Sequence, residues 1–197
     1  MLECDASGAT LTQYWDYTAC IGDPNVPSED KDIDREIYRM LFEAVEKRLV
    51  SDVPLGAFLS GGLDSSVVVA IMNQLQSEPV KTFSIGFEGP QTHNELPYAR
   101  RVAEHCGTDH HEFLVKPDIV ELLPELVRFL DEPFAISSAI PVYILARAAR
   151  NHVTVILTGD GGDEVFGGYD QYLYERWASM YRRLPKVVDR QLIRIAR

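Results

Sequence analysis

A short polar segment, SGGLDSS at residues 60–66, stands between two apolar stretches and carries the side chains best suited to chemistry. The first stretch is typical of a buried strand, and the second of a helix that begins near Ser65. Glycine lets the backbone approach an oxyanion without interference from a Cβ atom, and serine hydroxyls add donors or cap the helix. Because the unpaired N–H groups of a helix start favour negative charge, the segment predicts a phosphate site.

Asp64 extends this prediction to a metal ion. A carboxylate beside bound phosphates would repel them unless a divalent cation lay between, so Asp64 indicates Mg²⁺ coordination. The segment lacks the Gly-Lys-Ser/Thr ending of a Walker A loop and does not match the GxGxxG pattern. The alternative is a strand-to-helix turn in which Asp64 and the serines only cap the helix. We favour phosphate binding because the whole string follows a strand-like apolar run.

A second group of carboxylates lies in LTGDGGDEVFGGYDQY at residues 157–172. Asp160, Asp163 and Glu164 follow a predicted strand, which places them at the same sheet edge as Asp64 if the two strands are neighbours. Concentrated like charges need a cation or a proton, so the simplest interpretation is one Mg²⁺ shared between Asp64 and Asp163. A glycine-rich turn whose acidic residues cap the next helix is the open alternative.

The elements that must position both segments alternate along the chain. We expect strands at 54–60, 80–87, 110–115 and 153–158, and helices at 65–76, 96–107, 117–130, 138–151 and from Asp170 onward. Strands separated by helices predict an α/β fold, with a twisted parallel sheet and helices on both faces. Ligands bind such sheets beyond the carboxyl ends of the strands, where the strand order reverses.

The chain before this alternation has two parts. Residues 1–27 are interpreted as an irregular, linker-like lead-in, since Gly, Pro, Asp and Asn cluster towards its end. Ser28 is the expected N-cap of a helix that runs to about Val50. The predicted organisation is therefore a lead-in at 1–27 and one α/β domain at 28–197.

Composition narrows the functional class. The 197 residues carry a net charge of −11, and nucleic-acid binders normally present basic surfaces, so we expect no nucleic-acid partner. Cys4, Cys20 and Cys106 lack paired spacing, which argues against a disulfide framework or a cysteine zinc site and favours a cytoplasmic location. No apolar run is long enough to span a bilayer, and the N-terminus lacks a signal-peptide pattern, so we expect no membrane partner.

A further group of metal-binding residue types is not interpreted as a site. His105, Cys106, His110 and His111 straddle a predicted helix end and a strand. Successive strand residues point to opposite faces, so His110 and His111 would not share a metal.

The two polar segments together resemble a known family. SGGLDSS at 60–66 is similar to the pyrophosphate loop (PP-loop) of the ATP pyrophosphatases, whose fold is adenine nucleotide alpha hydrolase-like. With LTGDGGDEVFGGYDQY at 157–172, the chain resembles the synthetase domain of the asparagine synthetase family. DEPFAISSAIP at 131–141 and GTDHHEF at 107–113 add to the likeness, which runs from about Trp15 to the end.

The resemblance implies roles for particular residues. The carboxylate of Asp160 would orient ammonia and accept a proton as the catalytic base, although well-studied members carry glutamate there. Asp64 and Asp163 would bind the metal. The ATP and pyrophosphate site would comprise Phe58, Leu59, Ser60, Gly61, Gly62, Asp64, Ser65, Ser66, Ile85, Thr158 and Gly159.

The resemblance also implies an activity and partners. The expected function is that of an ATP- and Mg²⁺-dependent carbon–nitrogen ligase, an amidotransferase of asparagine biosynthesis that adenylates aspartate, releases pyrophosphate and lets ammonia displace AMP. A glutaminase domain elsewhere in a longer protein would supply the ammonia from glutamine, and a homodimer is an expected assembly. The chain would be truncated at its C-terminus. Alternatives are a relative with another acceptor, including one that closes a lactam, and a nucleotide-binding module without turnover.

Overall fold

The computed structural model describes residues 1–16, 18, 29–88, 94–116, 119–133 and 136–182. Its contacts divide the chain into two units, 1–43 and 44–197. The first unit contains a two-stranded antiparallel hairpin, β1 (Leu2–Asp5) and β2 (Gly8–Leu11), and most of helix α1 (Asp30–Arg48). The second unit contains every other helix and strand of the described residues.

The hairpin corrects the interpretation of the lead-in as irregular. Asp5 pairs with Gly8, and the carboxylate of Asp5 accepts hydrogen bonds from both the backbone amide and the hydroxyl of Ser7, which close the turn. Each strand has only four residues and none of them is buried, so no alternating apolar pattern marks them in the sequence. Ser28, the expected cap of α1, lies outside the described residues, and the domain boundary there stays a prediction.

The second unit is built on a four-stranded parallel sheet in the order β5–β4–β3–β6. Its strands are β3 (Leu55–Phe58), β4 (Lys81–Phe87), β5 (Asp109–Val115) and β6 (Val155–Leu157). Phe58 pairs with Phe83 on one side of β3, and Ala57 pairs with Leu157 on the other. The α/β fold with a parallel sheet is therefore confirmed.

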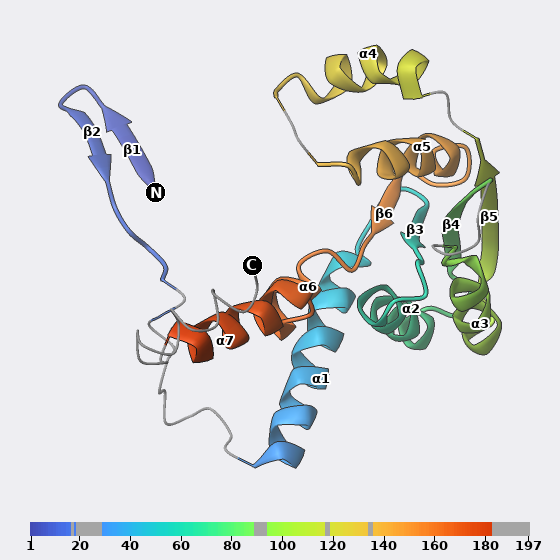
Figure 1. Cartoon of the computed structure of the whole chain (residues 1–197), viewed down its shortest axis with the longest axis horizontal. Coiled ribbons are helices and arrows are strands. Elements are labelled where there is room, and N and C mark those ends of the chain that lie inside the picture. The colour runs from blue at the N-terminus through green and yellow to red at the C-terminus, as the bar shows by residue number, and fades with distance from the viewer. Residues whose placement is uncertain (17, 19–28, 89–93, 117–118, 134–135, 183–197) are drawn as a thin grey trace, which may run out of the picture. The chain divides into compact units, whose positions relative to one another are not determined.

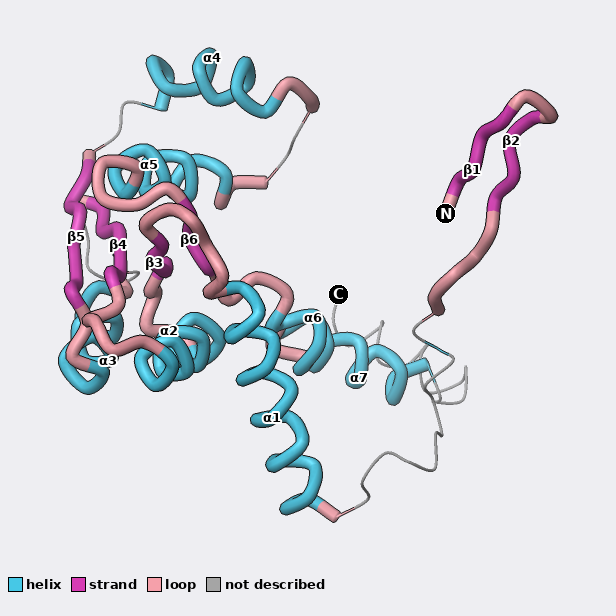
Figure 2. Tube along the Cα trace, turned by 180° about the vertical axis from the view of Figure 1, so that it is seen from behind, coloured by secondary structure: helices cyan, strands magenta, loops and turns pink. Residues whose placement is uncertain are grey.

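Helices cover both faces of this sheet (Figures 1 and 2). Helices α2 (Leu63–Leu75) and α3 (Leu96–Cys106) lie on one face, and α5 (Ala139–Ala149) lies on the other, with α4 (Ile119–Leu130) beyond it. Phe83 of the sheet packs with Leu145, Ala149 and Val153 in one buried cluster under α5. On the opposite side, Val69, Met72 and Ala99 are fully buried.

The strand order locates a switch point between β3 and β6. From β3 the chain moves outward through β4 to β5, and it then returns across α4 and α5 to pair β6 with the other edge of β3. Right-handed crossovers in opposite directions account for helices on both faces. The loops after β3 and β6 therefore leave the sheet in opposite directions and open a crevice at its carboxyl edge.

The expected helices and strands of this unit all occur, with ends that differ by a few residues. The acidic segment after β6 differs from the expected loop, because Gly162–Phe166 within it forms a short helix, α6. Helix α7 (Asp170–Arg182) follows and has no buried residue. Among the described residues, no helix is long and apolar enough to cross a membrane.

Candidate active site

The loop after β3 is held by its own serine hydroxyls. Ser60 Oγ lies 2.9 Å from Ser65 Oγ, and it accepts a hydrogen bond from the Gly62 amide at 3.1 Å. Ser66 Oγ donates to the Gly62 carbonyl at 2.6 Å, and the Ser65 hydroxyl donates to the same oxygen. These bonds fold residues 60–66 into one compact turn that leads directly into α2.

Gly61 is required by both conformation and space. Its φ of +82° lies in the left-handed region that other residues avoid. A Cβ at this position would approach the Tyr98 carbonyl carbon of α3 to 2.5 Å, which is far closer than any normal contact. The turn can therefore pass this close to α3 only because residue 61 is glycine.

The first turn of α2 offers backbone donors to a ligand. Within the described residues, the amides of Gly61, Leu63 and Asp64 have no protein acceptor. Such free N–H groups at the start of a 13-residue helix carry partial positive charge and suit an oxyanion. The local geometry is thus that of an anion-binding turn.

The loop after β6 holds a carboxylate in place through its first residue. Thr158 Oγ1 donates a hydrogen bond to Asp160 Oδ2 at 2.9 Å. Gly161 then takes a φ of +92° and precedes α6 as its N-cap, so that Asp163 and Glu164 lie in the first turn of the helix. The three carboxylates therefore project from a loop and one helical turn, and not from a loop alone as expected.

The loop after β3 and the loop after β6 contact each other at two glycines of the loop after β6. A Cβ at Gly162 would lie 2.5 Å from Asp64 Oδ2, and a Cβ at Gly159 would lie 2.7 Å from the Ser65 amide nitrogen. The backbone of the second loop therefore lies directly against the Asp64 side chain and the start of α2. This contact fixes the loops as neighbours, as the pairing of β3 with β6 requires.

A cavity of about 430 Å³ opens between these loops, α5 and the turn before α7. Its lining combines predicted site residues with others: Phe58, Ser60, Asp64, Ser65, Val142, Thr158, Gly159, Asp160, Gly161, Asp163, Glu164 and Tyr169. Volume alone does not distinguish this cavity, because a hollow beside α4 at Leu123 and Val127 has about 620 Å³. The distinction lies in the convergence of two loops at the switch point of the sheet.

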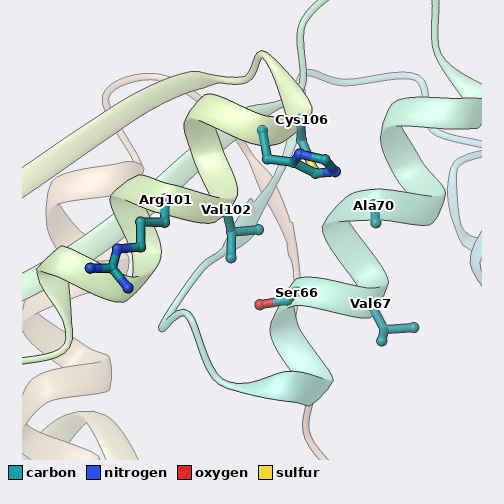
Figure 3. A pocket seen from close by; sticks show the side chains of 7 residues that line it. Ser66, Val67, Ala70, Arg101, Val102 and Cys106 are labelled. Atoms are coloured by element: carbon teal, nitrogen blue, oxygen red, sulfur yellow. The ribbon is translucent and has the colours of Figure 1, made fainter.

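Several predicted site residues do not line the cavity. The side chain of Leu59 is buried, its amide donates to the Phe83 carbonyl at 2.9 Å, and its carbonyl accepts from Ser84 Oγ. Ile85 packs against the buried cluster under α5. Ser66 faces a different groove, between α2 and α3, together with Ala70, Arg101 and Cys106 (Figure 3). Gly61 and Gly62 shape the turn without lining the cavity.

The charge of the cavity is strongly negative. Its lining includes Asp64, Asp160, Asp163 and Glu164 and contains no Lys or Arg among the described residues. A polyphosphate would be repelled there unless a cation accompanied it. Within the same described residues, no three acidic, His or Cys side chains are grouped as a complete metal site. Mg²⁺ fits this arrangement, because it needs only one or two carboxylates when phosphate oxygens and waters complete its coordination.

Sequence reasoning missed Tyr169 and gave Glu164 no role of its own. The Tyr169 hydroxyl donates to Glu164 Oε1 at 2.7 Å, and both side chains line the cavity. This hydrogen bond lowers the pKa of Glu164 and raises the pKa of Tyr169 to about 12. The only sequence signal was the spacing of a tyrosine five residues after an acidic one, across two glycines.

The histidines at the other end of the sheet have structural roles. His110 Nδ1 lies 2.8 Å from Thr82 Oγ1 on one face, while His111 stacks on Phe83 on the other, with ring centroids 5.3 Å apart. Burial lowers the pKa of His110, and burial raises the pKa of the Cys106 thiol. Among the described residues they form no metal-binding group.

The fold and the two loops together define the class of protein. The second unit is a doubly wound α/β domain with a glycine- and serine-lined turn and an acidic loop on either side of its switch point. The family model "Asparagine synthase" matches residues 36–196, so the chain belongs to the asparagine synthase family and is an asparagine synthetase-like synthetase domain.

Individual relatives agree with this assignment. A Methanocaldococcus jannaschii protein, named among the glutamine-hydrolysing asparagine synthetases, is 45% identical over 160 residues, covering 80% of this chain and 31% of the relative. The Bacillus subtilis asparagine synthetase [glutamine-hydrolyzing] 1 is 36% identical over 172 residues, covering 87% and 27%. The chain thus spans about a third or less of their length.

A solved structure also matches. The NH3-dependent NAD synthetase from Campylobacter jejuni superposes with a TM-score of 0.46 and 16% identity, covering 68% of this chain and 60% of that one.

Proposed function

We propose that this domain binds ATP with Mg²⁺ and uses it to activate a carboxylate, that of aspartate, for amide formation. An oxygen of the acceptor carboxylate attacks the α-phosphorus of ATP, the bond from that phosphorus to the bridging oxygen breaks, and pyrophosphate leaves. Ammonia then attacks the acyl carbon, AMP leaves, and the nitrogen gives up one proton as the amide forms. The observation that carries the proposal is the convergence of the two loops in one cavity at the switch point.

The turn at 60–66 is proposed to hold the leaving pyrophosphate. Its free amides at Gly61, Leu63 and Asp64 would donate to phosphate oxygens, and the partial positive charge of the α2 start would stabilise the charge that develops on them. Phe58 and Val142 supply apolar surface in the same cavity, which suits the adenosine part of the nucleotide. We give Ile85 and Leu59 only supporting roles, because their side chains pack in the core.

Asp64 and Asp163 are proposed to hold Mg²⁺, and Asp160 to accept the proton from the attacking ammonia. The bound ion would supply charge neutralisation between the phosphates and four carboxylates. Thr158 would orient Asp160 through its hydrogen bond to Oδ2, which leaves Oδ1 as the oxygen available to a proton donor. The ammonia is proposed to come from a glutaminase domain of a longer protein.

Titration calorimetry with ATP tests the binding step, with and without Mg²⁺. We expect the wild-type chain to bind ATP more tightly with Mg²⁺ and Asp64→Ala to lose that gain. Asp52→Ala removes an exposed aspartate outside the cavity and serves as the matched control. Equal affinity in the wild type and Asp64→Ala would remove Asp64 from the site.

Measurement of AMP formation tests the chemistry. Added aspartate and ammonia should release AMP and pyrophosphate in equal amounts. AMP formation that requires a different carboxylate would identify a relative with another acceptor. ATP binding without any AMP would identify a nucleotide-binding module without turnover.

A further inference from the structure

Helix α6 carries Asp163 but has little to hold it in place. It is five residues long and none of them is buried. An isolated helix of this length is unstable in water, because one turn fixes several dihedrals for very few hydrogen bonds. Interactions beyond the helix itself must therefore keep Asp163 in position.

The turn after α6 supplies the first of these interactions. Gly167 takes a left-handed φ of +69°, and the Gly168 amide donates to the Asp163 carbonyl at 3.0 Å, which folds the turn back over the helix. A Cβ at Gly168 would overlap Asp163 Oδ1, so the turn lies directly against that carboxylate. The backbone at 167–168 therefore defines one side of the space that the Asp163 carboxylate occupies.

The second interaction is a side-chain bond that closes the same turn. Tyr169 follows Gly168, and its hydroxyl reaches back to donate to Glu164, the neighbour of Asp163, at 2.7 Å. The Tyr172 amide donates to the Tyr169 carbonyl at 3.0 Å, so Tyr169 is also fixed to the start of α7. The bond thus ties the first turn of α6 to α7 across the two glycines.

We infer that Tyr169 and Glu164 are a positioning pair, which keeps the turn at 167–168 closed against Asp163 and so sets the direction of the Asp163 carboxylate. This inference rests on the proposed function, because the direction matters only if Asp163 binds the cation that accompanies ATP. In the proposed reaction, neither residue contacts the reacting atoms. Both act through Asp163.

The test compares Tyr169→Phe, Glu164→Ala and Glu164→Gln with the wild-type chain. Tyr169→Phe removes only the hydroxyl, and Glu164→Gln keeps an oxygen that accepts from it. Tyr174→Phe is the matched control, because Tyr174 is an exposed tyrosine of α7 whose ring contacts Trp177 and does not line the cavity.

The first readout needs no nucleotide. Amide hydrogen exchange at Gly168, followed by NMR, should accelerate roughly two- to fivefold in Tyr169→Phe and Glu164→Ala, in line with the loss of one hydrogen bond. Glu164→Gln and Tyr174→Phe should exchange as the wild type does. Unchanged exchange in Tyr169→Phe would overturn the inference, whether or not the chain binds ATP.

The second readout is ATP affinity by calorimetry with and without Mg²⁺. The Mg²⁺-dependent gain should fall roughly two- to fivefold in Tyr169→Phe and Glu164→Ala. Affinity without Mg²⁺ should stay constant in Tyr169→Phe, because this change leaves the charge of the cavity as it is. Adding Tyr169→Phe to Glu164→Ala should reduce the gain no further, because the bond is already absent. If the wild type binds Mg²⁺ and ATP but Tyr169→Phe keeps its full gain, the positioning role is wrong. If the wild type binds no ATP, the proposed function fails, and the exchange data still decide whether the pair closes the turn.

Discussion

Replacement of Gly162 by alanine would separate the stability of the fold from the geometry of the site. A Cβ at residue 162 would lie 2.5 Å from one carboxylate oxygen of Asp64 and 2.8 Å from the other. Normal contacts between non-bonded heavy atoms are about 3.5–4.0 Å, so the new methyl group and the Asp64 carboxylate must move apart by about 1 Å. The flexible partner is the Asp64 side chain, which must rotate away or be pushed into the cavity.

The cost to folding should be small. Gly162 is the first residue of α6, and its φ is not among the positive values that exclude other residues. Alanine favours a helix over glycine by up to about 1 kcal/mol, which offsets the cost of about 1 kcal/mol for an Asp64 side chain away from its rotamer. We therefore expect the free energy of unfolding to stay within about 1 kcal/mol of the wild type.

The cost to ligand binding should be much larger. A change in the surroundings of a metal ligand typically weakens metal affinity by roughly ten- to a hundredfold. Calorimetry should show a loss of that order in the Mg²⁺-dependent affinity for ATP, while urea unfolding gives near-normal stability.

Gly107→Ala supplies the opposite control. Gly107 ends α3 with a φ of +64°, has open space around it and lies outside the cavity. Alanine there should lower the free energy of unfolding by roughly 1 kcal/mol through backbone strain, with ATP affinity unchanged. Normal Mg²⁺-dependent affinity in Gly162→Ala would refute the contact between the second loop and Asp64 as a determinant of the site.

Three further predictions follow from the site and the core. Asp160→Ala should retain ATP affinity and lose ATP-dependent amide formation, because Asp160 is the proposed proton acceptor; an amide yield equal to the wild type in a chromatographic assay would contradict that role. Ser65→Ala should weaken ATP affinity several-fold whereas Ser66→Ala should not, because only Ser65 lines the cavity; calorimetry that gives equal losses would show that both serines contact the ligand. Burial lowers the pKa of His110, so the unfolded chain binds a proton at this residue more readily than the folded chain does. The stability that comes from a neutral, buried His110 is therefore fully present above about pH 6.5 and is lost as the pH falls towards the folded pKa. Urea unfolding at about pH 7.5 and about pH 5.5 should show a larger loss for the wild type than for His110→Asn, and an equal loss would count against a buried neutral His110.

The alternation of apolar runs predicted the second unit well. The strand at 80–87 and the helix at 96–107 appear as β4 (Lys81–Phe87) and α3 (Leu96–Cys106), because buried strands and amphipathic helices leave different periods in the sequence. The hairpin at Leu2–Leu11 escaped that reasoning, since short exposed strands have no apolar period. Helix α6 escaped it too, because five residues without a buried face carry no helical pattern.

The sequence by itself determined the types of residue that form the site. Two glycine-rich segments after predicted strands, one with Asp64 and one with Asp160 and Asp163, were sufficient to propose phosphate and Mg²⁺ binding. Residue type and local spacing decide such turns, because glycine, serine and aspartate act on the backbone within a few residues of their own position.

The tertiary structure decided which of these residues face one another. The pairing of β6 beside β3 placed Gly162 against Asp64. The neighbouring α3 placed Ser66 in a separate groove, and β4 covered Leu59, which bonds to Phe83 and Ser84. The left-handed backbone at Gly167 brought Tyr169 back to Glu164. The contacts between the two loops depend on strand order, which arises from packing of the whole sheet and leaves no local pattern in the sequence.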